Sequence, residues 1–358
     1  MDISIRMTQK LEFAGSIYQQ LMQQLSLIDS FKGNWKAIEH KDSKQLKELR
    51  KIATIESIGS STRIEGSTLT DTEVEKLLKS VKITKLNTRD EQEVIGYYET
   101  LQVILDNYED IKLSERYIHQ LHGMLLKFSN KDQSHKGKYK TVSNQVVAHY
   151  PDGTKRTIFK TTEPGLTANE MQGTIEWANE RFTKKDTHPI IIIAAFVYEF
   201  LSIHPYQDGN GRLSRLLTTL LMMQQEYKFI QYVSFENIIE TKKEEYYRAL
   251  MDCQKNRGKK EEQIDKWILF FLECIVMLIQ RLEAKYATYN KLSKELNDRQ
   301  QKILQYIKKK KKVQISEVET SFKDYSRNTL KKDLAYLVNE GLLIRTGERK
   351  GVKYHIKE

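Results

Sequence analysis

The chain has 358 residues and a net charge of +11, and its length predicts two or three domains, each with a hydrophobic core. Its longest apolar stretches, residues 189–200 and 267–279, are too short or too interrupted by charge to cross a bilayer, and the N-terminus lacks a signal-peptide pattern. We therefore expect a cytoplasmic protein with no membrane partner. The two cysteines, Cys253 and Cys274, are expected to be buried free thiols rather than a disulfide scaffold.

Most of the chain carries apolar residues at three- and four-residue spacing, which predicts a mainly α protein. Hydroxyl and carboxylate pairs predict capping boxes at residues 70–73 and 167–170, and Ser114 is expected to begin another helix. The expected helices cover residues 8–30, 42–65, 70–82, 88–109, 114–128, 167–184, 188–203, 212–226, 241–256 and 261–292.

Residues 61–66, with the sequence STRIEG, close the second of these helices. Gly66 is a natural helix stop, so Glu65 falls in the last turn. Its negative charge opposes the helix dipole there unless a cation faces it. The segment therefore predicts a cationic partner for Glu65.

Residues 139–162 break the helical pattern with β-branched and alternating apolar residues around the turn sequence YPDG at 150–153. They predict a β-hairpin flap on the helical core. After the last long helix the composition changes to a run of five lysines at 308–312. We therefore place domain limits at residues 1–87, 88–292 and 293–358.

Residues 204–215, with the sequence HPYQDGNGRLSR, contain the candidate catalytic and ligand-binding residues. Pro205 ends an apolar helix at His204, so a loop must follow. Gly209 and Gly211 allow that loop to turn its main-chain amides toward one point, and Arg212 is predicted to begin the next helix.

The loop amides and the positive end of that helix suit a polyphosphate, and Arg212 and Arg215 lie three residues apart on one helix face. Asp208 adds one carboxylate, which suits Mg²⁺ held mainly by phosphate oxygens and water. His204 is mostly neutral near pH 7 and is the candidate general base. Together these residues favour phosphoryl or nucleotidyl transfer to a hydroxyl group.

The segment resembles the signature of the Fic family, HPFxDGNGRxxR, with Tyr206 in place of Phe. A buried Tyr206 then needs a partner for its hydroxyl. Further similarities around His122, at residues 137–140 and at residues 188–189 extend the resemblance over roughly residues 88 to 280. The resemblance implies a Fic-type helical core that transfers AMP from ATP, with Mg²⁺, to a Tyr, Thr or Ser hydroxyl of a target protein.

The resemblance also implies a role for each position. His204 is the base, Asp208 holds Mg²⁺, and the flap docks the target as an added strand. The intact Gly209 and Gly211 favour AMP transfer over transfer of another group. The residues expected to bind the nucleotide are Asp208, Gly209, Asn210, Gly211, Arg212, Arg215, Tyr246 and Tyr247.

Residues 61–66 resemble the family's inhibitory motif, [S/T]xxxE[G/N], which involves Ser61, Glu65 and Gly66. By resemblance Arg215 is the cation that faces Glu65. Such a pair would occupy the arginine needed for the γ-phosphate and lower resting activity. The resemblance also permits the reverse reaction, in which Glu65 activates water to remove AMP.

Residues 298–358 predict a winged helix-turn-helix, and residues 326–334 resemble its recognition helix. Residues 297–358 hold 16 Lys or Arg against 8 Asp or Glu, so +8 of the +11 lies here. This charge supports DNA contact through residues 298–358. Binding to a protein, dimer formation and a solvated surface remain alternatives, and the oligomeric state stays open.

A second hypothesis is a DNA-binding regulator whose Fic-like core senses nucleotide without turnover. The intact His204, Asp208 and Asn210 argue against it, because a sensor does not need the base. A toxin paired with an antitoxin is disfavoured because the inhibitory motif lies in the same chain. His119 and His122 lack a third ligand at metal-binding spacing and are interpreted as structural. Modification of the chain itself on a tyrosine is left open.

Overall fold

The computed structural model describes residues 3–39, 43–80, 86–149, 154–259, 261–347 and 351–356. It divides into two compact units, Met1–Leu282 and Glu283–Glu358. The last helix of the first unit, α12 (Asp265–Glu295), runs past this division. The functional division at residues 87 and 292 stays a prediction.

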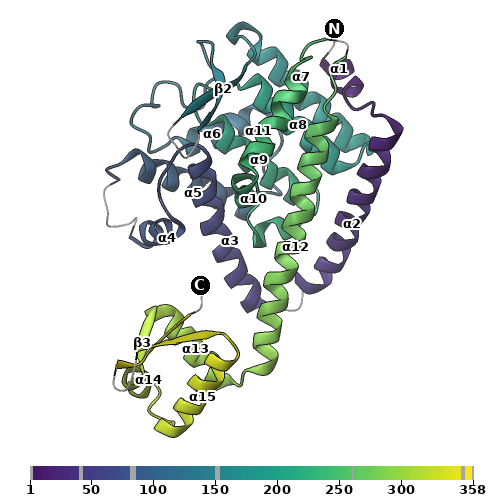
Figure 1. The fold of residues 1–358 in the computed structure, drawn as a ribbon. Coiled ribbons are helices and arrows are strands. Elements are labelled where there is room, and N and C mark those ends of the chain that lie inside the picture. The colour runs from purple at the N-terminus through teal and green to yellow at the C-terminus, as the bar shows by residue number, and fades with distance from the viewer. Residues whose placement is uncertain are drawn as a thin grey trace. The chain divides into compact units, whose positions relative to one another are not determined.

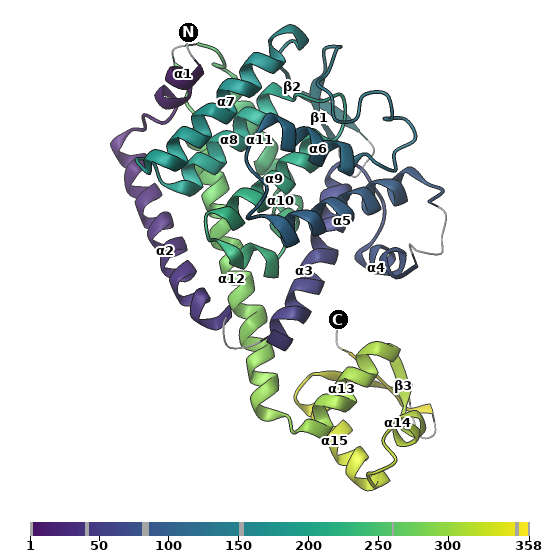
Figure 2. The same ribbon diagram turned by 180° about the vertical axis from the view of Figure 1, so that it is seen from behind.

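Two buried helices form the centre of the first unit (Figures 1 and 2). In α8 (Pro189–Ile203) Glu199 is the only charged residue, and α9 (Asn210–Gln224) is buried from Arg212 to Met223. The two helices pack on each other. Burial of so many apolar side chains stabilises them and brings the end of α8 close to the start of α9.

Further helices surround this pair, and one of them, α3, ends within residues 61–66. They are α3 (Ser43–Ile64), α4 (Asp71–Ser80), α5 (Arg89–Asn107), α6 (Glu115–Leu125), α7 (Pro164–Lys184), η1 (Lys228–Tyr232), α10 (Phe235–Thr241) and α11 (Lys243–Gln254). The capping box at Thr70 and Glu73 is confirmed, with Glu73 N–H donating to Thr70 Oγ1 at 3.3 Å. The expected start at Ser114 is confirmed as well, since its side chain accepts from Tyr117 N–H.

The single helix predicted over residues 8–30 is wrong. The structure has α1 (Ile3–Gln9) and α2 (Gly15–Glu39) with a break between them. At the break the Lys10 side chain is 1% exposed and pairs with Glu199 and Glu262. The buried ion pairs anchor the chain at the break between the two helices.

Two further expectations differ from the structure. Residues 167–170 are not a helix start, because α7 begins at Pro164 and Thr167 Oγ1 donates to Glu163 O inside it. Proline suits that first position, since its missing N–H is not needed there. The expected helices leave out residues 227–240, where the structure has η1 and most of α10.

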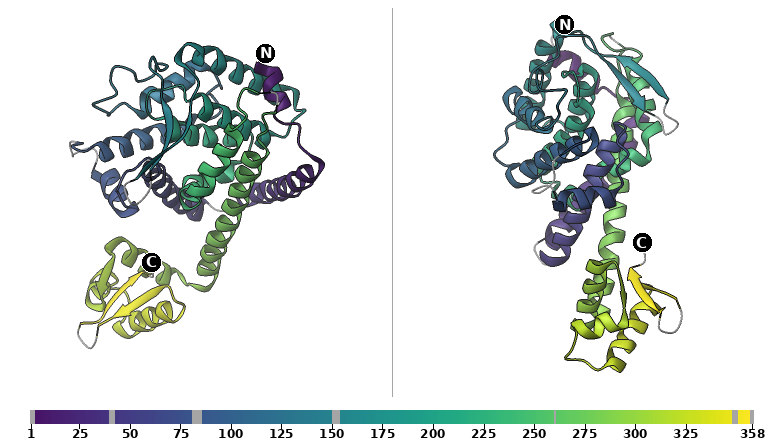
Figure 3. Two further views of the ribbon diagram at one scale, coloured as in Figure 1. Left: turned by 45° about the horizontal axis from the view of Figure 1, so that its top comes forward. Right: turned by 90° about the vertical axis from the view of Figure 1, so that its left-hand side faces the viewer.

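The flap is a two-stranded antiparallel ribbon at the edge of the first unit (Figure 3). Its strands are β1 (Gln145–His149) and β2 (Lys155–Lys160), with a bulge between Val146 and Val147. The predicted hairpin is therefore present, and its turn at 150–153 lies outside the described residues.

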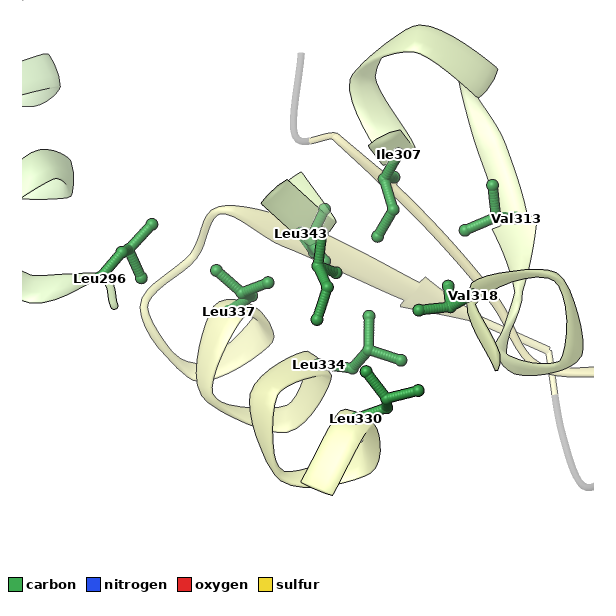
Figure 4. Packing of buried hydrophobic residues seen from close by; sticks show 9 residues of the cluster. Leu296, Ile307, Val313, Val318, Leu330, Leu334, Leu337 and Leu343 are labelled. Atoms are coloured by element: carbon green, nitrogen blue, oxygen red, sulfur yellow. The ribbon is translucent and has the colours of Figure 1, made fainter. Parts of the chain in front are cut away.

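The second unit has the order of a winged helix-turn-helix, as predicted. Its three-stranded antiparallel sheet has the order β3 (Lys312–Gln314), β5 (Lys353–Ile356), β4 (Leu343–Thr346). Leu330, Leu334 and Leu337 project from one face of the third helix toward Leu343 and Val318, and form the core (Figure 4). The elements are α13 (Asp298–Lys310), β3 (Lys312–Gln314), α14 (Ile315–Ser321), α15 (Arg327–Asn339), β4 (Leu343–Thr346) and β5 (Lys353–Ile356).

Cys253 and Cys274 are buried free thiols, as expected. Burial raises the pKa of the Cys253 thiol to about 12, which keeps it protonated and unreactive. Among the helices that the structure describes, none combines the length and the apolar content needed to cross a membrane.

Candidate active site

The loop between α8 and α9 has the backbone that its sequence requires. His204 caps α8 in the left-handed region, with φ of 52°, and its N–H donates to Phe200 O at 2.9 Å. Gly209, with φ of 81°, is the cap from which α9 begins. The helix therefore starts two residues before Arg212, and the N–H groups of its first turn have no partner within the helix.

The Asn210 side chain shapes this loop. Its Oδ1 accepts from Tyr206 N–H at 2.9 Å, and its Nδ2 donates to Tyr206 O at 2.7 Å. The resemblance implies a direct role in phosphate binding, whereas here the amide closes the turn. The main-chain amides at the start of α9 are then the groups that can meet a phosphate.

The Tyr206 hydroxyl has the partner that the sequence requires. It lies 2.8 Å from His119 Nδ1, while the ring stacks on His122 with centroids 3.7 Å apart. His122 Nδ1 accepts from Gly137 N–H at 2.8 Å, so its Nε2–H donates to Asp208 O at 2.9 Å. Burial lowers the pKa of His122 to about 4. His119 and His122 are thus structural supports of the loop.

Substitution of Tyr206 by Phe is expected to lower the free energy of unfolding of the first unit by about 1 kcal/mol, because one side-chain hydrogen bond is lost and the ring remains. All three tryptophans lie in this unit, so their fluorescence during urea denaturation reports the change. In a His119→Ala background the same substitution should cost less. An equal cost in both backgrounds would contradict this contact.

Asp208 is surrounded by cations. Its Oδ2 accepts from Lys131 Nζ at 2.6 Å, and its Oδ1 accepts from Arg212 Nη2 at 3.0 Å and from Gly209 N–H at 2.6 Å. Burial raises the pKa of Asp208, but these groups outweigh burial and hold it well below the usual range. Asp208 is therefore an anion at neutral pH.

The donor set around Asp208 fits Mg²⁺ that arrives with a nucleotide. The described residues contain no group of three or more His, Cys, Asp or Glu side chains that could hold a metal by themselves. One ionised carboxylate suits an ion whose other ligands are phosphate oxygens and water.

The two signature arginines are buried and differ in their partners. Arg212 contacts Glu93 through Nη1 at 3.3 Å as well as Asp208. Arg215 donates from Nε to Ser61 Oγ at 2.8 Å and from Nη2 to Ser61 O at 2.9 Å. Ser61 therefore orients the Arg215 guanidinium.

Glu65 forms the ion pair that the resemblance implies, with Arg215 Nη2 2.8 Å from Glu65 Oε1. Gly66 has φ of 104° and ends the segment after α3, as expected of a helix stop. Lys243 Nζ donates to Ile64 O at 3.0 Å and adds a second cation at this helix end. A Cβ on Gly211 would overlap the Glu65 carboxylate, so this glycine allows the close approach.

Burial raises the pKa of Glu65, but Arg215 and Arg212 outweigh burial and lower it below the ordinary value. Glu65 is therefore ionised and held at the start of α9, beside the arginine assigned to the γ-phosphate. Its inhibitory effect stays a prediction.

The His204 imidazole is set up to accept a proton. Its Nδ1 lies 3.3 Å from Leu201 O. Because a carbonyl only accepts, Nδ1 carries the hydrogen and Nε2 keeps its lone pair. Burial lowers the pKa of His204 to about 4, and the Lys140 charge acts in the same direction. His204 is thus neutral at physiological pH.

Tyr246 and Tyr247 lie in α11 and are buried. Their rings pack edge to face, with centroids 5.2 Å apart, and Tyr246 also packs edge to face on Trp267. Burial raises the pKa of the Tyr246 hydroxyl, and the positive charge of Arg215 opposes this shift. Contact of either ring with adenine stays a prediction.

Sequence reasoning missed four residues of the site: Glu93, Lys131, Lys140 and Asn144. Lys140 belongs to the segment at 137–140 that resembles the family, but nothing in its spacing indicates its hydrogen bonds to the residues on either side of His204. Glu93, Lys131 and Asn144 lie 60 or more residues from their partners, and only the fold brings them together.

A helical core that presents this loop between two buried helices is the Fic fold, and comparisons with known proteins agree. Residues 112–222 match the model of the Fic/DOC family, and residues 299–349 match that of the DeoR-like helix-turn-helix domain. The chain therefore contains a Fic domain, homologous to Fic adenylyltransferases, and a C-terminal helix-turn-helix.

The chain is 28% identical over 207 residues to "Protein adenylyltransferase Fic" of Drosophila willistoni and to that of Drosophila melanogaster. In both cases the match covers 57% of this chain and 39% of the relative, so the chain spans about two fifths of their length.

Solved structures share the fold. A Fic family protein from Desulfovibrio desulfuricans has a TM-score of 0.63 at 19% identity and covers 97% of this chain and 98% of its own. A Fic domain containing signaling protein from Bacteroides thetaiotaomicron has a TM-score of 0.59 at 22% identity and covers 73% of this chain and 97% of its own.

Proposed function

We propose that the protein transfers AMP from ATP to a Tyr, Thr or Ser hydroxyl of a target protein. The observation that carries the proposal is the single loop that joins His204, with a free Nε2 lone pair, to the amide-rich start of α9 and Arg215. Homology to proteins named protein adenylyltransferase Fic supports the same activity.

In the reaction the target hydroxyl oxygen attacks the α-phosphorus of ATP and forms a new P–O bond. The bond from that phosphorus to the oxygen bridging to the β-phosphate breaks, and pyrophosphate leaves with the electron pair. His204 Nε2 accepts the hydroxyl proton. The amides of the first turn of α9, Arg212 and Arg215 stabilise the charge on the phosphate oxygens. Mg²⁺ bound by Asp208 and the nucleotide would neutralise part of that charge.

We further propose that Glu65 restrains this activity. Its ion pair occupies the Nη2 donor of the Arg215 guanidinium, and the carboxylate lies against Gly211, where a phosphate would approach. ATP would then bind in a pose that does not lead to transfer.

Mass spectrometry of a cell lysate incubated with the Glu65→Gly variant and ATP tests the proposed function. Adenylated Tyr, Thr or Ser peptides are expected, and the matched control is the same variant carrying His204→Ala. Peptides modified equally with both variants would contradict catalysis by this loop.

We propose DNA contact for the C-terminal module as a second function. Support comes from the match to the DeoR-like helix-turn-helix model and from the exposed Lys331 and Lys332 on α15. Arg327 on the same helix is paired with Glu319 at 2.8 Å. The two lysines are therefore the better candidates for phosphate contacts.

The double substitution Lys331→Glu and Lys332→Glu is expected to weaken binding to mixed-sequence duplex DNA about tenfold or more. It should also reduce the dependence of log K on log salt by about two. Fluorescence anisotropy at several salt concentrations measures both. The control is Lys76→Glu with Lys79→Glu, the same charge change on exposed residues of α4. Equal effects of both pairs would contradict recognition through α15.

A further inference from the structure

Lys140 is a buried lysine at the root of the flap. Its side chain is 3% exposed, and its Nζ donates to Asn144 Oδ1 at 2.9 Å, Thr161 Oγ1 at 2.8 Å and Ile203 O at 2.8 Å. An ammonium has three donors, so all of them are used. Burial of a charged ammonium group costs free energy, which its three hydrogen bonds offset, and such an arrangement points to a specific role for this lysine.

The same network holds the backbone on both sides of His204. Lys140 Nζ donates to Ile203 O, and the backbone N–H of Lys140 donates to Pro205 O at 2.8 Å. Asn144 Nδ2 donates to the other two carbonyls of this stretch, Tyr206 O at 2.7 Å and His204 O at 3.3 Å. Four consecutive carbonyls, from 203 to 206, are therefore held by two residues that precede β1.

His204 needs such support because its backbone is left-handed, with φ of 52° and ψ of 61°. A side chain with a Cβ occupies this region at a cost, and it stays there only where surrounding contacts determine the conformation. The direction of the imidazole depends on this conformation, since it sets where the Cα–Cβ bond points.

Both ends of the hairpin enter the network. Lys140 and Asn144 lie before β1, and Thr161 follows β2 directly, with its hydroxyl donating to Asn144 O at 3.0 Å. A change at the flap root therefore reaches the His204 backbone through side-chain hydrogen bonds, without passing through α9.

We propose that Lys140 is a positioning residue that ties the flap root to the backbone of His204 and aims the imidazole at the acceptor hydroxyl. The reaction it serves is the proposed AMP transfer. The hydrogen bonds of Lys140 to the loop reach residues 203 and 205, on either side of His204, and none of residues 209–215, so its effect falls on proton abstraction rather than on ATP binding.

The charge of Lys140 also acts on His204. Burial lowers the pKa of Lys140 to about 8, so the lysine is protonated below that pH, where His204 titrates. The charged groups that act on His204 are Lys140, which lowers its pKa, and Glu65 and Asp208, which raise it. Loss of the Lys140 charge must therefore raise the pKa of His204.

NMR titration of the histidine rings in the full chain tests this placement without nucleotide or target. The His204 signal is assigned by its loss in His204→Ala. In Lys140→Met its midpoint is expected to move upward by roughly half a pH unit. In Lys138→Met, which removes the same charge from an exposed lysine two positions earlier, it should stay in place. Equal midpoints in both variants would overturn the proposal.

Kinetics in the Glu65→Gly background test the consequence. Lys140→Met is expected to lower kcat about tenfold or more with the KM for ATP within twofold, and Lys138→Met should leave both unchanged. A fall in ATP affinity as large as the fall in kcat would overturn the positioning role.

If Lys140→Met does not fold, Thr161→Val removes one partner with no change in charge, and it should lower kcat alone. If no variant transfers AMP, the proposed function fails, while the NMR titration still decides the placement of Lys140.

Discussion

Replacement of Glu65 by glycine is expected to raise AMP incorporation roughly 10- to 100-fold, the range set by one charge-assisted hydrogen bond that must otherwise break. In the resting chain the Arg215 guanidinium bonds to Glu65 and to both oxygens of Ser61. The substitution removes only the first partner. Ser61 continues to orient the guanidinium, which is then free to meet the γ-phosphate. Transfer of label from α-labelled ATP to protein measures the gain.

Two variants sharpen this test. Glu65→Gln keeps an acceptor for Arg215 without the charge and should give a smaller gain. Glu56→Gly makes the same change within α3, nine residues before Glu65, and should give none, even though it also weakens the helix. Equal labelling by the wild type and Glu65→Gly would discard the inhibitory role of the ion pair.

Replacement of His204 by alanine in the Glu65→Gly background is expected to lower AMP transfer roughly 10²- to 10⁴-fold, the usual loss when a general base is removed. Burial keeps the pKa of His204 at about 4, so the wild-type imidazole is a neutral acceptor throughout the physiological range. Nucleotide binding should persist, because the start of α9 and both arginines are untouched. Single-turnover labelling and isothermal titration with ATP measure the two effects.

These two measurements also separate the main hypothesis from its rival. A DNA-binding regulator that only senses nucleotide would bind ATP equally well with or without His204 and would show no transfer in either variant. Transfer that survives in His204→Ala would remove the imidazole from the mechanism.

Local chemistry explains why the candidate site could be predicted from sequence. Pro205 ends the preceding helix, and Gly209 and Gly211 permit backbone conformations that other residues rarely adopt, so a turn that leads into a helix is the natural result. Tyr206 in a buried position requires a hydrogen-bond partner, and His119 provides it. The same holds for the second unit, where the spacing of Leu330, Leu334 and Leu337 alone specifies the buried face of α15.

Long-range contacts explain what could not be predicted. The break between α1 and α2 follows from the burial of Lys10 against Glu199, almost two hundred residues away, and no local signal marks it. The start of α7 at Pro164 was missed because Thr167 and Glu170 imitate a capping box. The contacts of Lys140 and Asn144 with residues 203–206 exist only once the flap root packs on the end of α8.

The central claim is that this loop moves the α-phosphate group of ATP, with its nucleoside, to a protein hydroxyl. The most direct measurement compares labelling of protein by the Glu65→Gly variant with ATP labelled at the α- or the γ-phosphate. We predict stable labelling from α-labelled ATP that disappears in the added His204→Ala variant, and none from γ-labelled ATP. Label from the γ-phosphate, or no label from either, would contradict the account.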